Sequence, residues 1–116
     1  MDNKGSFIRG SVDMIILALL QKEDCYGYQL TMLIKEYSGN LLNVPVGSLY
    51  PSLYKMEERG YISTVQKVIK NRTRMYYHLE SAGKDYLVAL YKDYCEIHDG
   101  IDKVLRKCSE YGGADR

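Results

Sequence analysis

Hydrophobic residues first recur at helical spacing between Ser11 and Gln21. Their i, i+3, i+4, i+7, i+8 pattern predicts an amphipathic helix, and further apolar residues at 14, 17 and 18 widen the stripe almost all round. A helix of this kind belongs at the centre of a core. Ser11 is its predicted N-cap, and Asp13 suits its first turn. The residues of the stripe are Val12, Ile15, Ile16, Leu19 and Leu20.

Two further helices are predicted before residue 60. One follows Asp24, its predicted cap, and ends at Gly39, with Leu30, Leu33, Ile34 and Tyr37 as its apolar repeat. The other begins near Pro45, ends at Arg59, and buries Leu49, Leu53 and Met56. Pro51 lies inside this pattern, which leaves open a later start with an irregular first turn. The outward side carries Ser48, Ser52, Lys55 and Arg59, with Tyr50 and Tyr54 on the other flank.

After residue 60 the spacing of hydrophobic residues changes from the helical repeat to a repeat of two residues. Tyr61–Lys67 and Thr73–Leu79 are predicted strands, because apolar and polar residues alternate along them. Val68–Arg72 is the predicted tip of the hairpin that they form, and Asn71 is suited to a positive φ.

The last predicted helix runs from Ser81 to about Ser109. Its apolar residues repeat at alternating spacings of 3 and 4, which is a heptad seam. A helix of this length spans roughly 40 Å, more than one small domain can cover. A second copy of the chain is the simplest partner for the apolar face that one domain leaves uncovered. The alternative is a helix that lies along its own domain. The seam consists of Leu87, Leu90, Tyr94, Ile97, Ile101, Val104 and Cys108.

The pattern predicts a mostly α chain with a small β-hairpin. We expect residues 1–80 to form a winged helix-turn-helix domain and residues 81–116 to form a long C-terminal dimerisation helix and tail. A helix followed by a basic hairpin suits DNA, since the helix fits the major groove and the hairpin places cations beside the backbone. The alternative is a winged helix that binds protein, with no preference for an operator.

Charge is distributed unevenly along the chain. Residues 1–79 carry ten Lys/Arg and seven Asp/Glu (10 − 7 = +3), and residues 80–116 carry six and eight (6 − 8 = −2). The predicted hairpin contains four cations and no acid, so it favours a polyanionic partner. A solvated hairpin has the same composition.

Three widely spaced cysteines, Cys25, Cys95 and Cys108, favour a reducing cytoplasm over a disulfide framework. No apolar run reaches the length of a membrane span, and no signal peptide is expected. The two histidines fit no catalytic pattern, so no enzyme activity and no cofactor are expected. Cys95, His98, Asp99 and Asp102 have a metal-like spacing, but the seam beside Cys95 favours packing over metal binding.

Three stretches of the sequence resemble the PadR family of bacterial transcriptional regulators. They are ILALL at 16–20 with YGYQL at 26–30, GSLYPSLYKMEERGYI at 47–62, and RTRMYYHL at 72–79 with Gly83. The single C-terminal helix is similar to the shorter PadR subfamily. Two positions depart from the family pattern: Asn71 replaces a wing glycine, and Glu80 replaces a capping threonine, so Ser81 is the predicted cap of the last helix.

The resemblance implies a homodimer, usually a repressor, that binds a palindromic double-stranded DNA operator with its third helix and wing, and the cysteines place it in the cytoplasm. The matching recognition-helix residues are Ser48, Tyr50, Pro51, Tyr54 and Lys55, and the matching wing residues are Lys70, Asn71, Arg72 and Arg74. Tyr50 packing against the wing as core is the structural alternative. The resemblance further implies a small aromatic effector between the C-terminal helices, beside Tyr91 and Tyr94, whereas a closed core at Tyr94 is the alternative.

Overall fold

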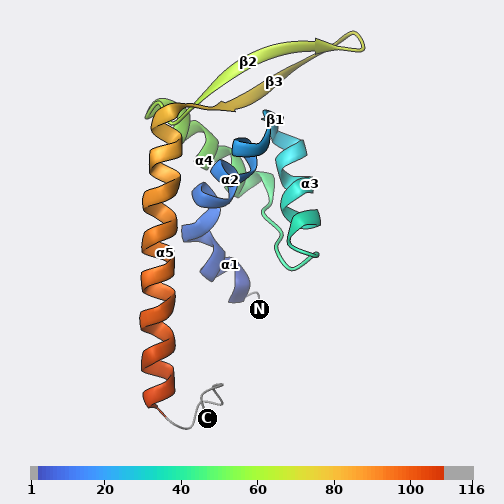
Figure 1. Ribbon diagram of the computed structural model, residues 1–116. Coiled ribbons are helices and arrows are strands. Elements are labelled where there is room, and N and C mark those ends of the chain that lie inside the picture. Colours follow the sequence, from blue (N-terminus) through green and yellow to red (C-terminus); the bar gives the residue numbers. More distant parts are fainter. Residues whose placement is uncertain (1–2, 109–116) are drawn as a thin grey trace.

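Short helices lie between one long C-terminal helix and a protruding β-hairpin (Figure 1). The structure, a computed structural model, describes residues 3–108. Its elements are α1 (Asn3–Ile8), a 3-10 turn (Arg9–Ser11), α2 (Val12–Lys22), β1 (Cys25–Tyr26), α3 (Gly27–Tyr37), α4 (Val46–Glu58), β2 (Ile62–Ile69), β3 (Arg72–Leu79) and α5 (Ser81–Lys107). The predicted fold class, mostly helical with a small hairpin and a long last helix, is confirmed.

Helix α2 forms the centre of the core, as its wide apolar stripe predicts. Ile16 and Leu17 are fully buried there, and α3, α4, β3 and α5 all pack against α2. The predicted stripe of α4 is confirmed, since all three of its residues are fully buried: Leu49, Leu53 and Met56. Burying this face of α4 leaves the opposite flank at the surface.

Of the two predicted N-caps, Ser11 is in the right position and Asp24 is not. Ser11 ends the 3-10 turn that joins α1 to α2 and is the N-cap residue of α2, although its side chain makes no capping bond. Asp24 precedes the two-residue strand β1, and α3 begins only at Gly27. The Tyr26 N–H donates to Gln29 Oε1 at 3.3 Å at the start of α3. Asp24 is free to pair elsewhere, and it accepts from His78 Nδ1 at 2.8 Å.

The three strands form an antiparallel sheet in the order β1-β3-β2. In the hairpin Ile62 pairs with Leu79 and Ile69 with Arg72, so the predicted five-residue tip shortens to Lys70 and Asn71. These two residues have φ of 53° and 63°. Two central residues with positive φ form a type I′ turn, whose twist matches that of the flanking strands, and this match lets pairing continue to the end.

Helix α4 begins at Val46, with Pro45 as its N-cap residue, so the predicted start near Pro45 is confirmed and the alternative of a later start is wrong. The Pro45 carbonyl accepts from the N–H groups of Ser48 and Leu49 at 2.9 and 3.0 Å, which closes a regular first turn. Proline lacks the N–H that would bond to the carbonyl four positions earlier, and its ring crowds that carbonyl, which here belongs to Gly47 and not to Pro45. The bonds that close the first turn therefore form in spite of Pro51.

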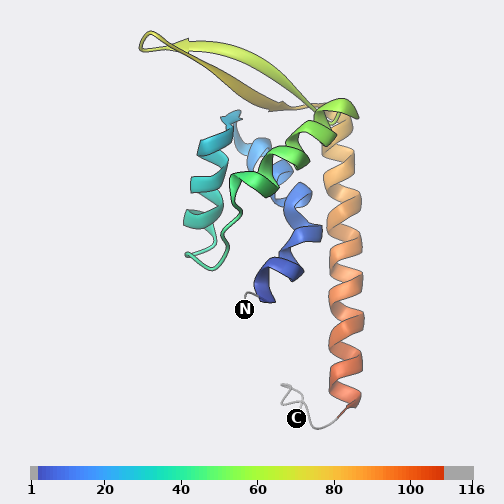
Figure 2. The same ribbon diagram turned by 180° about the vertical axis from the view of Figure 1, so that it is seen from behind.

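Helix α5 begins at Ser81, which is its first helical residue, so the predicted Ser81 cap is wrong. Glu80 occupies the N-cap position without a side-chain cap, and its carboxylate accepts from Ser63 Oγ at 2.6 Å. The predicted C-terminus at Ser109 lies outside the described residues. Figure 2 shows α5 extending well beyond the helices that its first half covers. Within residues 3–108, no helix is both long and apolar enough to cross a membrane.

Candidate nucleic-acid interface

The outward flank of α4 presents four of the predicted recognition residues to solvent. Ser48, Tyr50, Pro51 and Tyr54 are all exposed, because the buried stripe turns them away from the core. Hydroxyl and aromatic groups on one helix face can hydrogen-bond base edges and contact thymine methyl groups. This flank has the chemistry of a recognition surface.

Tyr50 joins α4 to the start of α3. Its phenol lies against Gly27, where a Cβ would overlap the Tyr50 ring. The side chain nevertheless stays 46% exposed, so the ring borders the surface and is not enclosed as core. Gly27 therefore sets how closely α3 and α4 approach at this point.

Lys55 forms an ion pair with a buried carboxylate. Its Nζ lies 2.9 Å from Oδ2 of Asp13 on α2, and the Lys55 side chain is 43% exposed against 11% for that of Asp13. Tyr86 of α5 donates to the same Oδ2 at 3.3 Å. Burial, followed by the Asp13 carboxylate, raises the pKa of Tyr86. Among the predicted recognition residues, Lys55 is the one that is directed toward a buried partner.

The tip of the wing carries the remaining predicted residues. Lys70, Asn71 and Arg72 are exposed where the hairpin reaches furthest from the helices (Figure 1). Their charge lies at the end of a paired hairpin. Cations in this position can contact phosphates or a minor groove.

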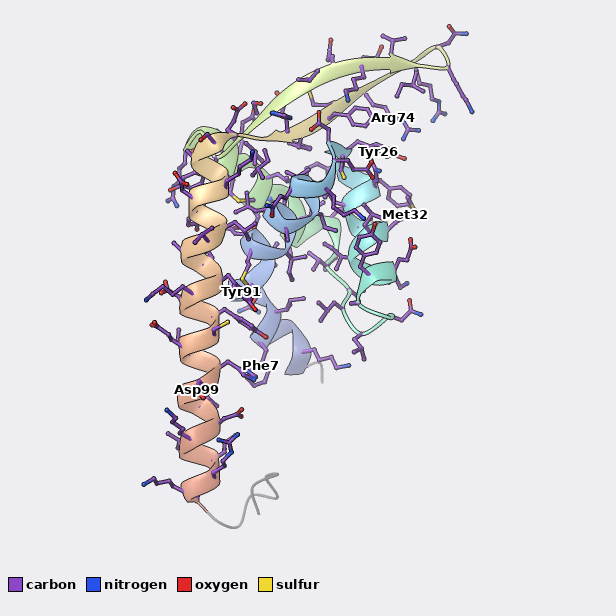
Figure 3. The ribbon with its side chains drawn as sticks, viewed as in Figure 1. Phe7, Tyr26, Met32, Arg74, Tyr91 and Asp99 are labelled. Atoms are coloured by element: carbon purple, nitrogen blue, oxygen red, sulfur yellow. The ribbon has the colours of Figure 1, made fainter. Side chains whose placement is uncertain are left out.

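Cations nearer the base of the wing lie over aromatic rings. The Arg74 guanidinium is 4.2 Å from the centre of the Tyr26 ring, and Lys67 Nζ is 4.7 Å from that of Tyr76. Figure 3 labels Arg74 on the wing and Tyr26 below it. The two rings meet edge to face at 5.4 Å. Lys67 also lies 3.6 Å from Asp24. Cation–π contacts of this kind are each worth about 0.5–1 kcal/mol at exposed sites. The Arg74 contact therefore helps to hold the wing against the start of α3, and the Lys67 contact joins the two strands of the wing.

A hollow of about 430 Å³ lies between α3, α4 and the wing. Its lining combines two predicted wing arginines with aromatic and apolar residues: Tyr26, Gly27, Tyr28, Tyr50, Arg72, Arg74, Met75 and Tyr77. Sequence reasoning did not find Tyr26, Gly27, Tyr28, Met75 or Tyr77. The signal for them was available in part, because YGY precedes a predicted helix and strand alternation places Met75 and Tyr77 on one face.

The seam of α5 is divided between two environments. Leu87 and Leu90 are half-buried against the core of their own domain. Tyr94, Ile97, Ile101 and Val104 are exposed, and so is Tyr91, whose ring centre lies 6.2 Å from that of Tyr94. The alternative of a helix lying along its own domain therefore describes the first half of α5, and the second half is without cover in this chain.

The metal-like spacing on α5 does not form a ligand cluster. Across residues 3–108 no three His, Cys, Asp or Glu side chains lie close enough together to hold a metal ion. Asp102 instead lies 3.8 Å from His98 and 3.9 Å from Arg106, one helical turn away on either side. These are the i, i+4 ion pairs of a solvated helix face.

Comparison with known proteins agrees with this geometry. Residues 16–89 match the profile of a family described as the transcriptional regulator PadR-like family. The transcriptional regulator Rv3488 of Mycobacterium tuberculosis is 32% identical over 107 residues, which cover 92% of this chain and 94% of that protein. An uncharacterized protein X of Lysinibacillus sphaericus is 32% identical over 100 residues, which cover 85% of this chain and 92% of that one.

Solved structures share the fold. A transcriptional regulator from Clostridium thermocellum has a TM-score of 0.71 at 32% identity, with 88% of this chain and 96% of that chain covered. Bacillus subtilis PadR in complex with operator DNA has a TM-score of 0.63 at 27% identity, with 70% of this chain and 46% of that chain covered. The profile match spans more than half of the sequence, and the chain therefore belongs to the PadR-like family of transcriptional regulators, DNA-binding proteins that are not enzymes.

Proposed function

We propose that this chain is a cytoplasmic homodimeric repressor that binds a palindromic DNA operator with α4 and the wing. The observation that carries the proposal is the exposed flank of α4 beside a cationic hairpin tip. The relative from B. subtilis, solved with operator DNA, supports it. In this proposal residues 1–80 bind DNA and residues 81–116 dimerise. The proposed DNA-contacting residues on α4 are Ser48, Tyr50, Pro51 and Tyr54, and those on the wing are Lys70, Asn71, Arg72 and Arg74.

The second half of α5 supports the dimer. Four seam residues there are exposed, and Phe7 of α1 is exposed as well. The radius of gyration is 16.8 Å, whereas a compact chain of this length has about 13 Å. The excess reflects an arm that carries apolar side chains into solvent. A second copy would cover them, since a two-fold interface uses the same surface twice.

Selection from a random duplex library, followed by salt titration of binding, tests the DNA-binding proposal. A dimer with about eight phosphate contacts has log affinity falling with log salt at a slope near −7. Replacing Lys70 and Arg72 by Ala flattens the slope and weakens all sequences alike. Lys103→Ala with Arg106→Ala is the matched control, because it removes two cations from the far end of α5. An unchanged slope in the wing variant contradicts the wing assignment.

Tyr54 is the proposed base-reading residue on α4. Tyr54→Ala should change the preference among selected duplexes more than it changes general affinity, whereas a uniform loss would make Tyr54 a positioning contact. If selection enriches no sequence at all, the chain is instead a winged-helix module for protein partners. The two outcomes separate the regulator from the interaction module.

A small planar aromatic effector is the second part of the proposal. Tyr91 and Tyr94 present two exposed rings, with 23° between their planes, on the arm that the second copy would meet. Two-fold symmetry would bring both copies of Tyr94 toward the axis, where the paired rings could sandwich a flat ligand by offset stacking. Quenching of tyrosine fluorescence by a panel of planar aromatic compounds tests this, with Tyr94→Leu as the variant. If binding is absent, or survives the substitution unchanged, Tyr94 fills a closed core.

A further inference from the structure

Three helices meet at one buried carboxylate. Asp13 of α2 is 8% exposed and is the one buried polar or charged residue in the described part of the chain. Its Oδ2 receives both the Lys55 ammonium of α4 and the Tyr86 hydroxyl of α5. A carboxylate in this position is destabilising unless its partners stay in place. The contact therefore ties the orientations of α2, α4 and α5 together.

A second attachment joins α4 to α5 near the end of α4. Tyr61, just after Gly60, stacks its ring on that of Tyr86 at 4.3 Å. The Tyr61 carbonyl accepts from the Glu80 N–H at 3.0 Å and lies directly against Gly83. Tyr86 thus belongs to both attachments, one through Lys55 within α4 and one through Tyr61 just after the end of α4. One attachment would leave α4 able to pivot, and two fix its direction relative to α5.

We propose that Asp13, Lys55 and Tyr86 form a junction that sets the orientation of α4 relative to α5. Lys55 is then a positioning residue and not a base-reading residue, in contrast to the role that the family resemblance implies for it. The inference rests on the proposed function, because pairing through α5 makes this orientation determine the distance between the two recognition helices. The operator property that depends on the junction is the spacing between half-sites.

The test uses the full-length protein and three duplexes. The first is the palindrome selected by the wild type, and the other two have its half-sites moved apart or together by one base pair. The variants are Asp13→Asn, Lys55→Met and Tyr86→Phe. Lys92→Met is the control, because it removes an exposed ion pair with Glu96 on α5 (2.7 Å) and leaves the junction intact.

The ratio of affinities for the selected duplex and the two altered spacings should fall at least threefold in the three junction variants. The Lys92→Met control should keep the ratio of the wild type. The salt slope should stay unchanged in Lys55→Met. A purely stabilising role predicts something different, because a smaller folded fraction weakens binding to all three duplexes equally. Asp13→Asn and Tyr86→Phe nearly preserve side-chain volume, so they decide the matter if Lys55→Met does not fold.

Two results would overturn the proposal. In the first, Lys55→Met lowers the salt slope and leaves the spacing ratio unchanged, which makes Lys55 a DNA contact. In the second, none of the three variants alters the spacing ratio.

A measurement without DNA separates this inference from the proposed function. Because Lys55 and Tyr86 meet the same oxygen, the shift in unfolding midpoint of the Lys55→Met/Tyr86→Phe double variant should differ from the sum of the single shifts. Additive shifts overturn the junction. If the wild type selects no duplex, the proposed function fails, while this cycle still reports on the junction.

Discussion

At the scale of residues, α4 carries side chains that are buried in the core and one, Lys55, that pairs with a buried carboxylate on α2. Helical spacing placed Leu49, Leu53 and Met56 correctly, because burial follows from periodicity alone. The same spacing placed Lys55 on the outward side, yet its ammonium lies beside Asp13. A long flexible side chain can extend around a helix to a buried partner. Such pairings depend on neighbours distant in sequence, so they could not be predicted from local pattern.

Gly83 allows α5 to lie directly on the backbone of Tyr61. An added Cβ would overlap the Tyr61 carbonyl and lie 2.7 Å from Leu79 Cδ1. We expect Gly83→Ala to lower the free energy of unfolding by about 1–3 kcal/mol, the usual cost of overpacking, in urea denaturation. Gly100→Ala on the same helix is the control. It meets nothing within 4 Å and should stabilise by up to about 1 kcal/mol through helix propensity. Equal stability of Gly83→Ala and the wild type would mean that α5 can shift without cost.

Cys25 makes the free energy of unfolding depend on pH in the alkaline range. Burial, followed by the nearby carboxylates of Glu23 and Asp24, raises the pKa of its thiol from 9.0 to about 11. Between pH 9 and 11 the unfolded chain loses this proton while the native chain keeps it. Stability therefore falls as the pH rises, by at most about 1.4 kcal/mol per pH unit for this group. Urea denaturation at pH 8 and pH 10 measures the fall, and Cys25→Ala should flatten it. Parallel pH profiles would exclude Cys25 as the source.

At the scale of elements, long periodic segments were predictable and short ones were not. The helices now labelled α2, α4 and α5 each carry several turns of apolar repeat. Helix α1 has six residues and β1 has two, too few for a period to be recognised. Without β1, Asp24 looked like a helix cap. The hairpin strands were predicted too short, because exposed Val68 and Ile69 depart from simple alternation.

The turn of the wing offers a test at this scale. Asn71 has φ of 63°, a left-handed conformation that costs roughly 1–2 kcal/mol for most L-residues and little for glycine or asparagine. Asn71→Val should open the hairpin end, with faster amide hydrogen exchange at the pairs nearest the tip. Asn71→Gly is the matched control and should retain slow exchange. Equal exchange in the two variants would show that the turn does not limit pairing.

At the scale of the whole molecule, the heptad predicted one continuous interface along α5. The structure divides it, because the first half of α5 must cover α2 before the remainder can extend freely. Leu87 and Leu90 pack against the core of their own domain, and the exposed part of the seam begins at Tyr94. The sequence period is the same in both halves. Spacing alone therefore could not show where one kind of packing ends and the other begins.

The proposed dimer can be disrupted at one seam position. Ile97 is 62% exposed in the single chain. Ile97→Asp would place an unpaired carboxylate in the interface twice, once per subunit, at a cost of several kcal/mol. We expect monomers in analytical ultracentrifugation. Ala89→Asp, an exposed position off the seam, should leave the assembly intact. A well-folded dimer carrying Ile97→Asp would show that the copies associate elsewhere.

The elongated shape also separates charge in space. The molecule is 59 Å long, and the wing and the distal part of α5 occupy opposite ends (Figure 1). The excess of cations belongs to residues 1–79 and the excess of carboxylates to residues 80–116. In the field of a polyanion such a body experiences a torque that turns the wing forward and α5 away before any contact forms. Fewer collisions with DNA would then occur in unproductive orientations, and this advantage would diminish as salt shortens the range of the field to about 8 Å at physiological ionic strength.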